Sequence, residues 1–96
     1  MELGSHWRII KDNISSLLNM EFDTSIFLTE DMFQAILNNL IIDSGWYENV
    51  FISFLIINND WERPLMKIYS SNLEDVFIAI KSIEYYCQES SLGKSG

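Results

Sequence analysis

The apolar residues of this chain recur at helical spacing in three segments. Over residues 5–20, 30–41 and 72–89 they fall three or four positions apart, which places them on one face of a helix. The three stripes are Trp7, Ile10, Ile14, Leu17 and Leu18; Phe33, Ile36, Leu37, Leu40 and Ile41; and Leu73, Val76, Phe77, Ile80, Ile83 and Cys87. We therefore expect three amphipathic helices over these ranges.

Signals at the helix starts support the second and third helices. Thr29 precedes two acidic residues, so an N-cap is followed by charges that favour the N-terminal end of the helix dipole. Residues 71–74 read as a capping box, in which the Ser71 side chain accepts a hydrogen bond from the backbone N–H of Glu74. The third helix is the most strongly marked element of the chain.

Residues 49–57 have a different pattern, which is typical of a strand. They are rich in Val, Ile and Phe, and from Val50 onward they are apolar on both faces apart from Ser53. A strand of this kind is usually covered on both sides. We therefore expect it to be central in a sheet or to lie at an interface.

A second strand is predicted directly after the first. Residues 58–60, Asn-Asn-Asp, favour a hairpin turn because these residue types tolerate positive φ. The chain then returns over residues 61–69, where Pro64 donates no backbone hydrogen bond and so indicates an edge strand or a bulge. A further short strand near residues 25–28 fits the pattern as well.

These elements predict one small α+β domain. A chain of 96 residues forms a single domain, and an apolar content of 48% is enough for one core. We expect an antiparallel sheet, built on the hairpin 49–57/61–69, packed against about three helices. The domain spans residues 1–90, and residues 91–96 are small and polar enough to form a disordered tail.

The net charge narrows the range of partners. Fourteen acidic side chains against six basic ones give a formal charge of −8. Direct binding to nucleic acid needs clustered Lys and Arg, which the chain lacks, whereas an acidic surface favours a basic partner. The alternative is that the acids serve solubility alone.

Residues able to do chemistry are scarce. His6 is the one histidine and follows a Gly-Ser pair that resembles a cloning remnant, so residues 1–6 include positions that need not be native. Cys87 lies on an apolar stripe, where a free cysteine acts as a small core residue. We expect no enzyme activity, no metal and no cofactor. No apolar run is long enough to cross a bilayer, and the chain reads as cytoplasmic.

Acidic residues interleaved with aromatic ones form the candidate partner-binding site. Aromatic side chains anchor interfaces, and flanking carboxylates steer a cationic partner. About 30 Å of strand separates the two main groups, so they belong to one broad surface or are two features. The alternative is that both tryptophans are core residues. The candidates are Trp46, Tyr47 and Glu48; Asp60, Trp61 and Glu62; and Glu21, Asp23, Glu30 and Asp31.

The overall profile resembles the small acidic immunity proteins that protect bacteria from nuclease toxins, including those of contact-dependent inhibition and colicin-type systems. The likeness covers the whole chain in length, acidity, α+β character and lack of a catalytic set. It rests on no motif, and no residue roles can be carried over. It implies a tight one-to-one complex that occludes or distorts the active site of a basic toxin.

Two other kinds of protein fit the same composition. A nucleic-acid mimic, such as a phage inhibitor of a defence nuclease, places carboxylates where phosphates would sit and competes with nucleic acid. A structural subunit forms a homodimer through the two-faced apolar strand 49–57 and associates strongly with itself.

Overall fold

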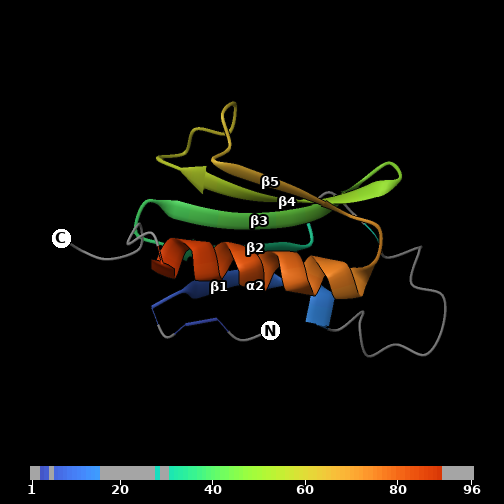
Figure 1. Ribbon diagram of the computed structural model, residues 1–96, viewed down its shortest axis with the longest axis horizontal. Coiled ribbons are helices and arrows are strands. Elements are labelled where there is room, and N and C mark those ends of the chain that lie inside the picture. Colours follow the sequence, from blue (N-terminus) through green and yellow to red (C-terminus); the bar gives the residue numbers. More distant parts are fainter. Residues whose placement is uncertain (1–2, 5, 16–27, 29–30, 90–96) are drawn as a thin grey trace.

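The computed structural model describes residues 3–4, 6–15, 28 and 31–89. These residues form a five-stranded antiparallel sheet with strand order β1-β2-β3-β4-β5 and a helix, α2, that lies across one face of the sheet (Figure 1). The predicted α+β class is confirmed, but the described residues hold one bounded helix rather than three. The elements are β1 (Arg8–Asp12), β2 (Phe33–Leu37), β3 (Leu40–Tyr47), β4 (Val50–Ile57), β5 (Met66–Ser70) and α2 (Leu73–Glu89).

Helix α2 matches the predicted range, but its cap lies one residue later than expected. The backbone N–H of Asp75 donates to Oδ1 of Asn72 over 2.9 Å, and Nδ2 of Asn72 donates to the Asp75 carboxylate over 3.2 Å. Asn72 therefore caps the helix in place of Ser71. The buried residues of α2 are Val76, Ala79, Ile80, Ile83 and Cys87.

The helix predicted over residues 30–41 is wrong. Strands β2 and β3 occupy this range and are joined by a turn at Asn38 and Asn39, with Leu37 paired to Leu40. Asn38 adopts a φ of 55°, which asparagine tolerates better than most residues. Alternation with a period of two is hidden here because both faces of β2 and β3 carry apolar residues. When both faces of a strand are apolar, some of its apolar residues fall three and four positions apart. The pattern then resembles the apolar stripe of a helix.

The helix predicted over residues 5–20 is wrong in its first part. Strand β1 pairs with β2 here, and its register shifts between Ile9 and Lys11, which is a β-bulge. The chain turns helical at Ile14, where Oδ1 of Asp12 accepts hydrogen bonds from the backbone N–H of Ile14 and of Ser15 over 3.1 and 3.0 Å. Residues 16–20 and the tail over 91–96 lie outside the described residues, as do residues 25–27 of the possible short strand.

The predicted strand over residues 49–57 is confirmed as β4, an interior strand of eight residues. The predicted second strand begins later than residue 61, because β5 starts at Met66. The connection covers residues 58–65 instead of a tight turn, and the backbone N–H of Leu65 donates to the carbonyl of Leu55 over 2.8 Å. Strand β5 does form an edge of the sheet, as predicted, with Pro64 in the connection before it.

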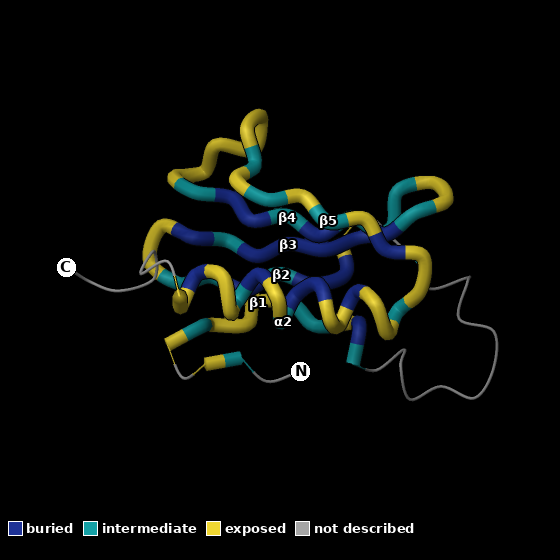
Figure 2. The backbone as a smooth tube through the Cα atoms, in the orientation of Figure 1, coloured by how far each residue is buried: buried dark blue, intermediate teal, exposed yellow. Residues whose placement is uncertain are grey.

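The hydrophobic core lies between α2 and one face of the sheet. Alternate residues of the interior strands point into it, and every residue of β2, β3 and β4 is buried or half-buried (Figure 2). Within the core, Oγ of Ser44 donates to Oγ of Ser53 over 2.7 Å, which satisfies two fully buried hydroxyl groups. The core residues of the sheet are Phe33, Ala35, Leu40, Ile42, Phe51 and Leu55.

The other face of the sheet is also largely apolar. Strand register places on this side the residues that alternate with the core residues, and among the described residues no helix packs on it. We call this surface the open sheet face. Its residues are Arg8, Lys11, Gln34, Ile36, Ile41, Asp43, Gly45, Tyr47, Val50, Ile52, Phe54, Ile56, Lys67 and Tyr69.

Candidate functional site

The first predicted group, residues 46–48, does not form a single surface. Trp46 packs against the core, with its ring centroid 4.7 Å from that of Phe51. Tyr47 lies on the opposite side of the sheet, where its ring meets Phe54 edge-on at 6.0 Å. Glu48 is exposed in the turn between β3 and β4. Trp46 therefore serves the core, and Glu48 is the most accessible of the three.

The second predicted group lies at the other end of β4. Asp60, Trp61 and Glu62 are exposed in the connection 58–65, and 47% of Trp61 is accessible. Because β4 has eight residues, about 27 Å of strand separates this group from the β3–β4 turn. The structure keeps the two groups apart, as the sequence spacing indicated.

The remaining predicted acids are only partly placed. Asp31 is exposed, and its Oδ2 lies 3.1 Å from Nζ of Lys11 in a surface ion pair. Glu21, Asp23 and Glu30 lie outside the described residues. Asp31 is thus adjacent to a cation of β1, and its charge is partly offset there.

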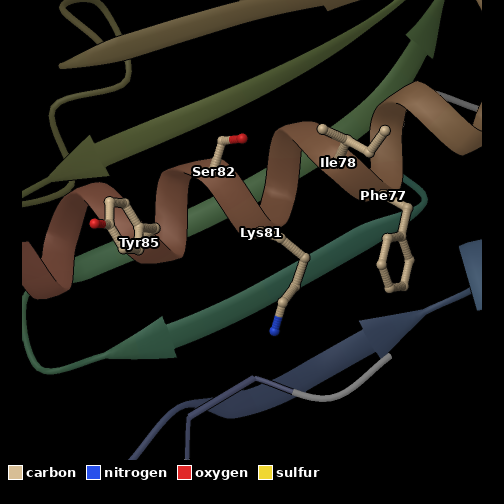
Figure 3. A pocket seen from close by; sticks show the side chains of 5 residues that line it. All are labelled: Phe77, Ile78, Lys81, Ser82 and Tyr85. Carbon is tan, nitrogen blue, oxygen red and sulfur yellow. The ribbon is translucent and has the colours of Figure 1, made fainter.

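Sequence reasoning missed an exposed apolar surface on the side of α2 that faces away from the sheet. Ile78 is 58% exposed and Tyr85 63% exposed, with Phe77 and Tyr86 also accessible. We call this surface the outer face of α2. It carries a shallow hollow of about 320 Å³ (Figure 3). The residues that line the hollow are Phe77, Ile78, Lys81, Ser82 and Tyr85.

The side chains of the hollow leave the helix in different directions. Figure 3 shows Phe77 and Lys81 on the side of the helix nearer β1, with Ile78 and Ser82 on the opposite side. Ile78, Ser82 and Tyr85 follow helical spacing of their own, four and three residues apart. This second stripe was the available sequence signal, since α2 is apolar on more of its circumference than one buried face requires.

The charges around the outer face of α2 are predominantly negative. Nζ of Lys81 lies 2.9 Å from Oε1 of Glu84, so the cation beside the hollow is compensated within one turn of helix. The other oxygen of Glu84 accepts a hydrogen bond from the backbone N–H of Gly4. Glu74 and Asp75 are exposed in the first turn, and the last turn contains no basic residue.

The open sheet face has a polar row across its middle. In register from β1 to β5 this row is Lys11, Gln34, Asp43, Phe54 and Lys67. Nε2 of Gln34 donates to Oδ2 of Asp43 over 3.1 Å, and Nζ of Lys67 lies 5.8 Å from the ring centroid of Phe54. A cation thus stands at each end of this row, and the apolar residues of the face lie on either side of it.

The carboxyl group of Asp43 is nearly inaccessible, at 7% exposure. Burial raises its pKa above the ordinary value, the hydrogen bond from Gln34 acts in the opposite direction, and the charge of Asp31 adds to the increase. The carboxyl group of Asp43 is therefore more easily protonated than that of an exposed aspartate.

The single cysteine is shielded in the core. Burial raises the pKa of Cys87 to about 11, and the charge of Glu84 contributes in the same direction. Its thiol is therefore protonated at neutral pH. Among residues 3–4, 6–15, 28 and 31–89, no three His, Cys, Asp or Glu side chains gather as metal ligands.

Comparison of the chain with protein-family models, with curated proteins and with solved structures finds no match. Within the described part of the chain, no helix combines the length and the apolar character needed to cross a membrane.

Proposed function

We propose that this protein is a protein-binding inhibitor, of the immunity-protein kind, that neutralises a basic nuclease-type toxin by forming a tight complex. The observation that carries the proposal is the outer face of α2. It presents exposed aromatic and aliphatic side chains on a rigid helix in acidic surroundings. The net charge of the chain, −8, attracts a basic partner of this kind.

The outer face of α2 has the residue types that dominate binding energy in protein interfaces. Aromatic side chains bury a large area with few rotatable bonds, and a central aromatic anchor can account for 2 kcal/mol or more, on the order of magnitude seen in alanine scans. Tyr85, the most exposed of these residues at 63%, also keeps a hydroxyl group for a polar contact. We assign it the role of central anchor.

The acidic residues of the helix act mainly on the rate of association. Glu74 and Asp75 at its start attract a positively charged protein from a distance and orient it towards the helix. This attraction is screened by salt over about 10 Å at 0.1 M ionic strength. The complex should therefore form more slowly and bind more weakly as salt concentration rises.

The connection 58–65 offers a second contact. Trp61 is exposed there between Asp60 and Glu62, so it combines an aromatic anchor with two carboxylates. Exposed aromatic residues at both places favour contact with a protein surface over imitation of a phosphate backbone, which needs regularly spaced charges alone.

The test is to capture the partner and measure binding. The gene neighbour is co-expressed with the tagged chain, the complex is sized by light scattering, and affinity is measured by calorimetry. We expect a basic partner, and we expect Tyr85→Ala to weaken binding at least tenfold. Tyr69→Ala is the matched control, because Tyr69 is equally exposed, at 59%, but lies on the open sheet face.

Trp61→Ala is the parallel variant for the second contact. If Trp61→Ala weakens binding of the partner and Tyr85→Ala does not, the main contact is at the connection 58–65. If no basic partner is recovered, or if neither variant alters the affinity, the proposed function is wrong.

A further inference from the structure

We infer that the open sheet face is the docking surface for a second copy of this chain, so that the protein is a homodimer with its two sheets packed face to face. The inference is independent of the proposed function, because it concerns the side of the sheet opposite α2. It rests on the composition, area and charge of this face.

The composition of this face is that of a covered surface. An antiparallel sheet with one side in water usually alternates apolar and polar residues. Here Ile41, Ile52 and Phe54 lie on the side opposite the core and are half-buried, while Ile56 on the same side is fully buried. Strands β3 and β4 thus carry apolar residues on both sides, while α2 covers only one side.

The area of this face suits a modest dimer interface. The five strands have 5, 5, 8, 8 and 5 residues, so at about 3.3 Å per residue and about 4.8 Å between strands the face spans roughly 500 Å². Two such faces together bury about 1,000 Å², which is the smallest area expected of a biological interface and suits a weak, reversible contact. An area of this size fits a reversible dimer and not an obligate one.

The charge distribution allows two acidic chains to meet on this side. Its one carboxylate is Asp43, which is buried and accepts a hydrogen bond from Gln34. The cations occupy the edge strands: Lys11 is paired with Asp31, and Nζ of Lys67 lies 5.5 Å from the ring centroid of Tyr69. Among the described residues, Asp31 is the one exposed acid beside this face, where it is paired with Lys11. The other exposed acids of the described residues are on the turns and on α2, namely Glu48, Asp60, Glu62, Glu74, Asp75 and Glu89.

The charge distribution of the open sheet face favours a second copy of the chain over the basic partner as its occupant. A basic protein gains little from a face whose accessible charges are Arg8, Lys11 and Lys67 at its edges. A second copy presents the same apolar residues on either side of the same polar row, and an isologous twofold interface uses one surface patch on both chains. In this dimer both outer faces of α2 point outward, so partner binding produces a two-to-two complex.

The direct test is sedimentation equilibrium of the full chain between 1 and 200 µM, at 50 and 500 mM NaCl. We expect twice the chain mass at the upper concentrations. The dimer should tighten at the higher salt, because two chains of −8 repel each other and salt screens the repulsion. A chain that stays monomeric at 200 µM in both salts overturns the inference.

Variants place the contact on the sheet. Ile52→Thr keeps a β-branched residue and should raise the dimer Kd at least tenfold, whereas Ile78→Thr on the outer face of α2 is the matched control and should leave it unchanged. Circular dichroism of each variant checks the fold. Equal effects of the two variants on the dimer Kd contradict the assignment of this face.

A second measurement applies if Ile52→Thr does not fold. Tyr69→Cys, at a position 59% exposed on an edge strand, is spin-labelled for measurement of distances between copies. Face-to-face packing predicts dipolar coupling between the two labels, and its absence at 200 µM contradicts the inference. The oligomeric state of the chain and the partner affinity of Tyr85→Ala together separate the two hypotheses. A chain that is monomeric and binds its partner one-to-one contradicts the dimer but not the proposed function.

Discussion

The hydroxyl groups of Ser44 and Ser53 form a hydrogen bond 2.7 Å long between β3 and β4, inside the hydrophobic core. Both residues are fully buried beneath α2. Ser53 is also the residue that interrupts the apolar run of β4. A polar residue is tolerated at this buried position because its hydroxyl group forms a hydrogen bond with that of its cross-strand neighbour, Ser44.

Ser53→Ala should therefore lower the free energy of unfolding by about 1–2 kcal/mol, because it leaves the Ser44 hydroxyl buried without this partner. The double variant Ser44→Ala/Ser53→Ala should lose less than the sum of the single variants. Urea denaturation of all four proteins gives the coupling energy. Strict additivity would show that the hydrogen bond contributes nothing to stability.

The buried carboxyl of Asp43 predicts a pH dependence of folding. Its pKa in the folded state is raised above 3.8, mainly by burial, so the folded protein binds a proton more tightly than the unfolded chain does. Its contribution to stability is complete below pH 3.8 and is lost as pH rises through the folded pKa.

Asp43→Asn should therefore raise the melting temperature at pH 7, and the difference from the wild type should disappear towards pH 3. The amide can still accept the hydrogen bond from Gln34. Thermal melts between pH 3 and 8 measure this, with Asp60→Asn as a control that removes an exposed acid. A lower melting temperature for Asp43→Asn at pH 7 would contradict the prediction.

The thiol of Cys87 should react slowly while the protein is folded. Its pKa of about 11, raised first by burial and then by the charge of Glu84, leaves very little thiolate at pH 7.5. We expect labelling by a disulfide reagent to follow the unfolding rate and to become rapid in urea. Rapid and complete labelling of the native chain would show that the cysteine is accessible.

The turn after β3 contains a conformation that glutamate adopts at a cost. Glu48 has a φ of 60°, in the left-handed region, whereas three of the asparagines adopt the same region at less cost. Glu48→Gly should raise the free energy of unfolding by about 0.5–1 kcal/mol, and Glu48→Asn by somewhat less. Urea denaturation checks this, and Glu48→Ala, which keeps the strain, should bring no gain.

Part of the fold could be predicted from the sequence. Helix α2 and strand β4 were predicted correctly because each has an unambiguous pattern: a periodic stripe with a cap, and a β-branched run between turn residues. The errors occurred at β1, β2 and β3. In β2 and β3, residues of the open sheet face such as Ile36 and Ile41 are apolar. The alternation of apolar and polar residues that indicates a strand is therefore missing.

The candidate surfaces were harder to predict. The exposure of Trp61 and the partial burial of Trp46 against the core depend on which side of the sheet each element faces, and local composition does not contain that information. The outer face of α2 was missed because Phe77 was assigned to the buried stripe and the apolar residues outside that stripe, Ile78, Tyr85 and Tyr86, were given no role. The cross-strand row from Lys11 to Lys67 joins five strands, so no spacing along the chain reveals it.

The order of the strands in the sheet is their order in the chain, and α2 follows all of them. A ribosome therefore releases the hairpin of β2 and β3, then β4 and β5, before the helix that covers their core side has emerged. During that interval both sides of the meander are apolar and bare. We therefore expect the nascent chain to be most prone to aggregation just before α2 is complete, and the yield of folded protein to depend on the speed of synthesis across residues 66–89.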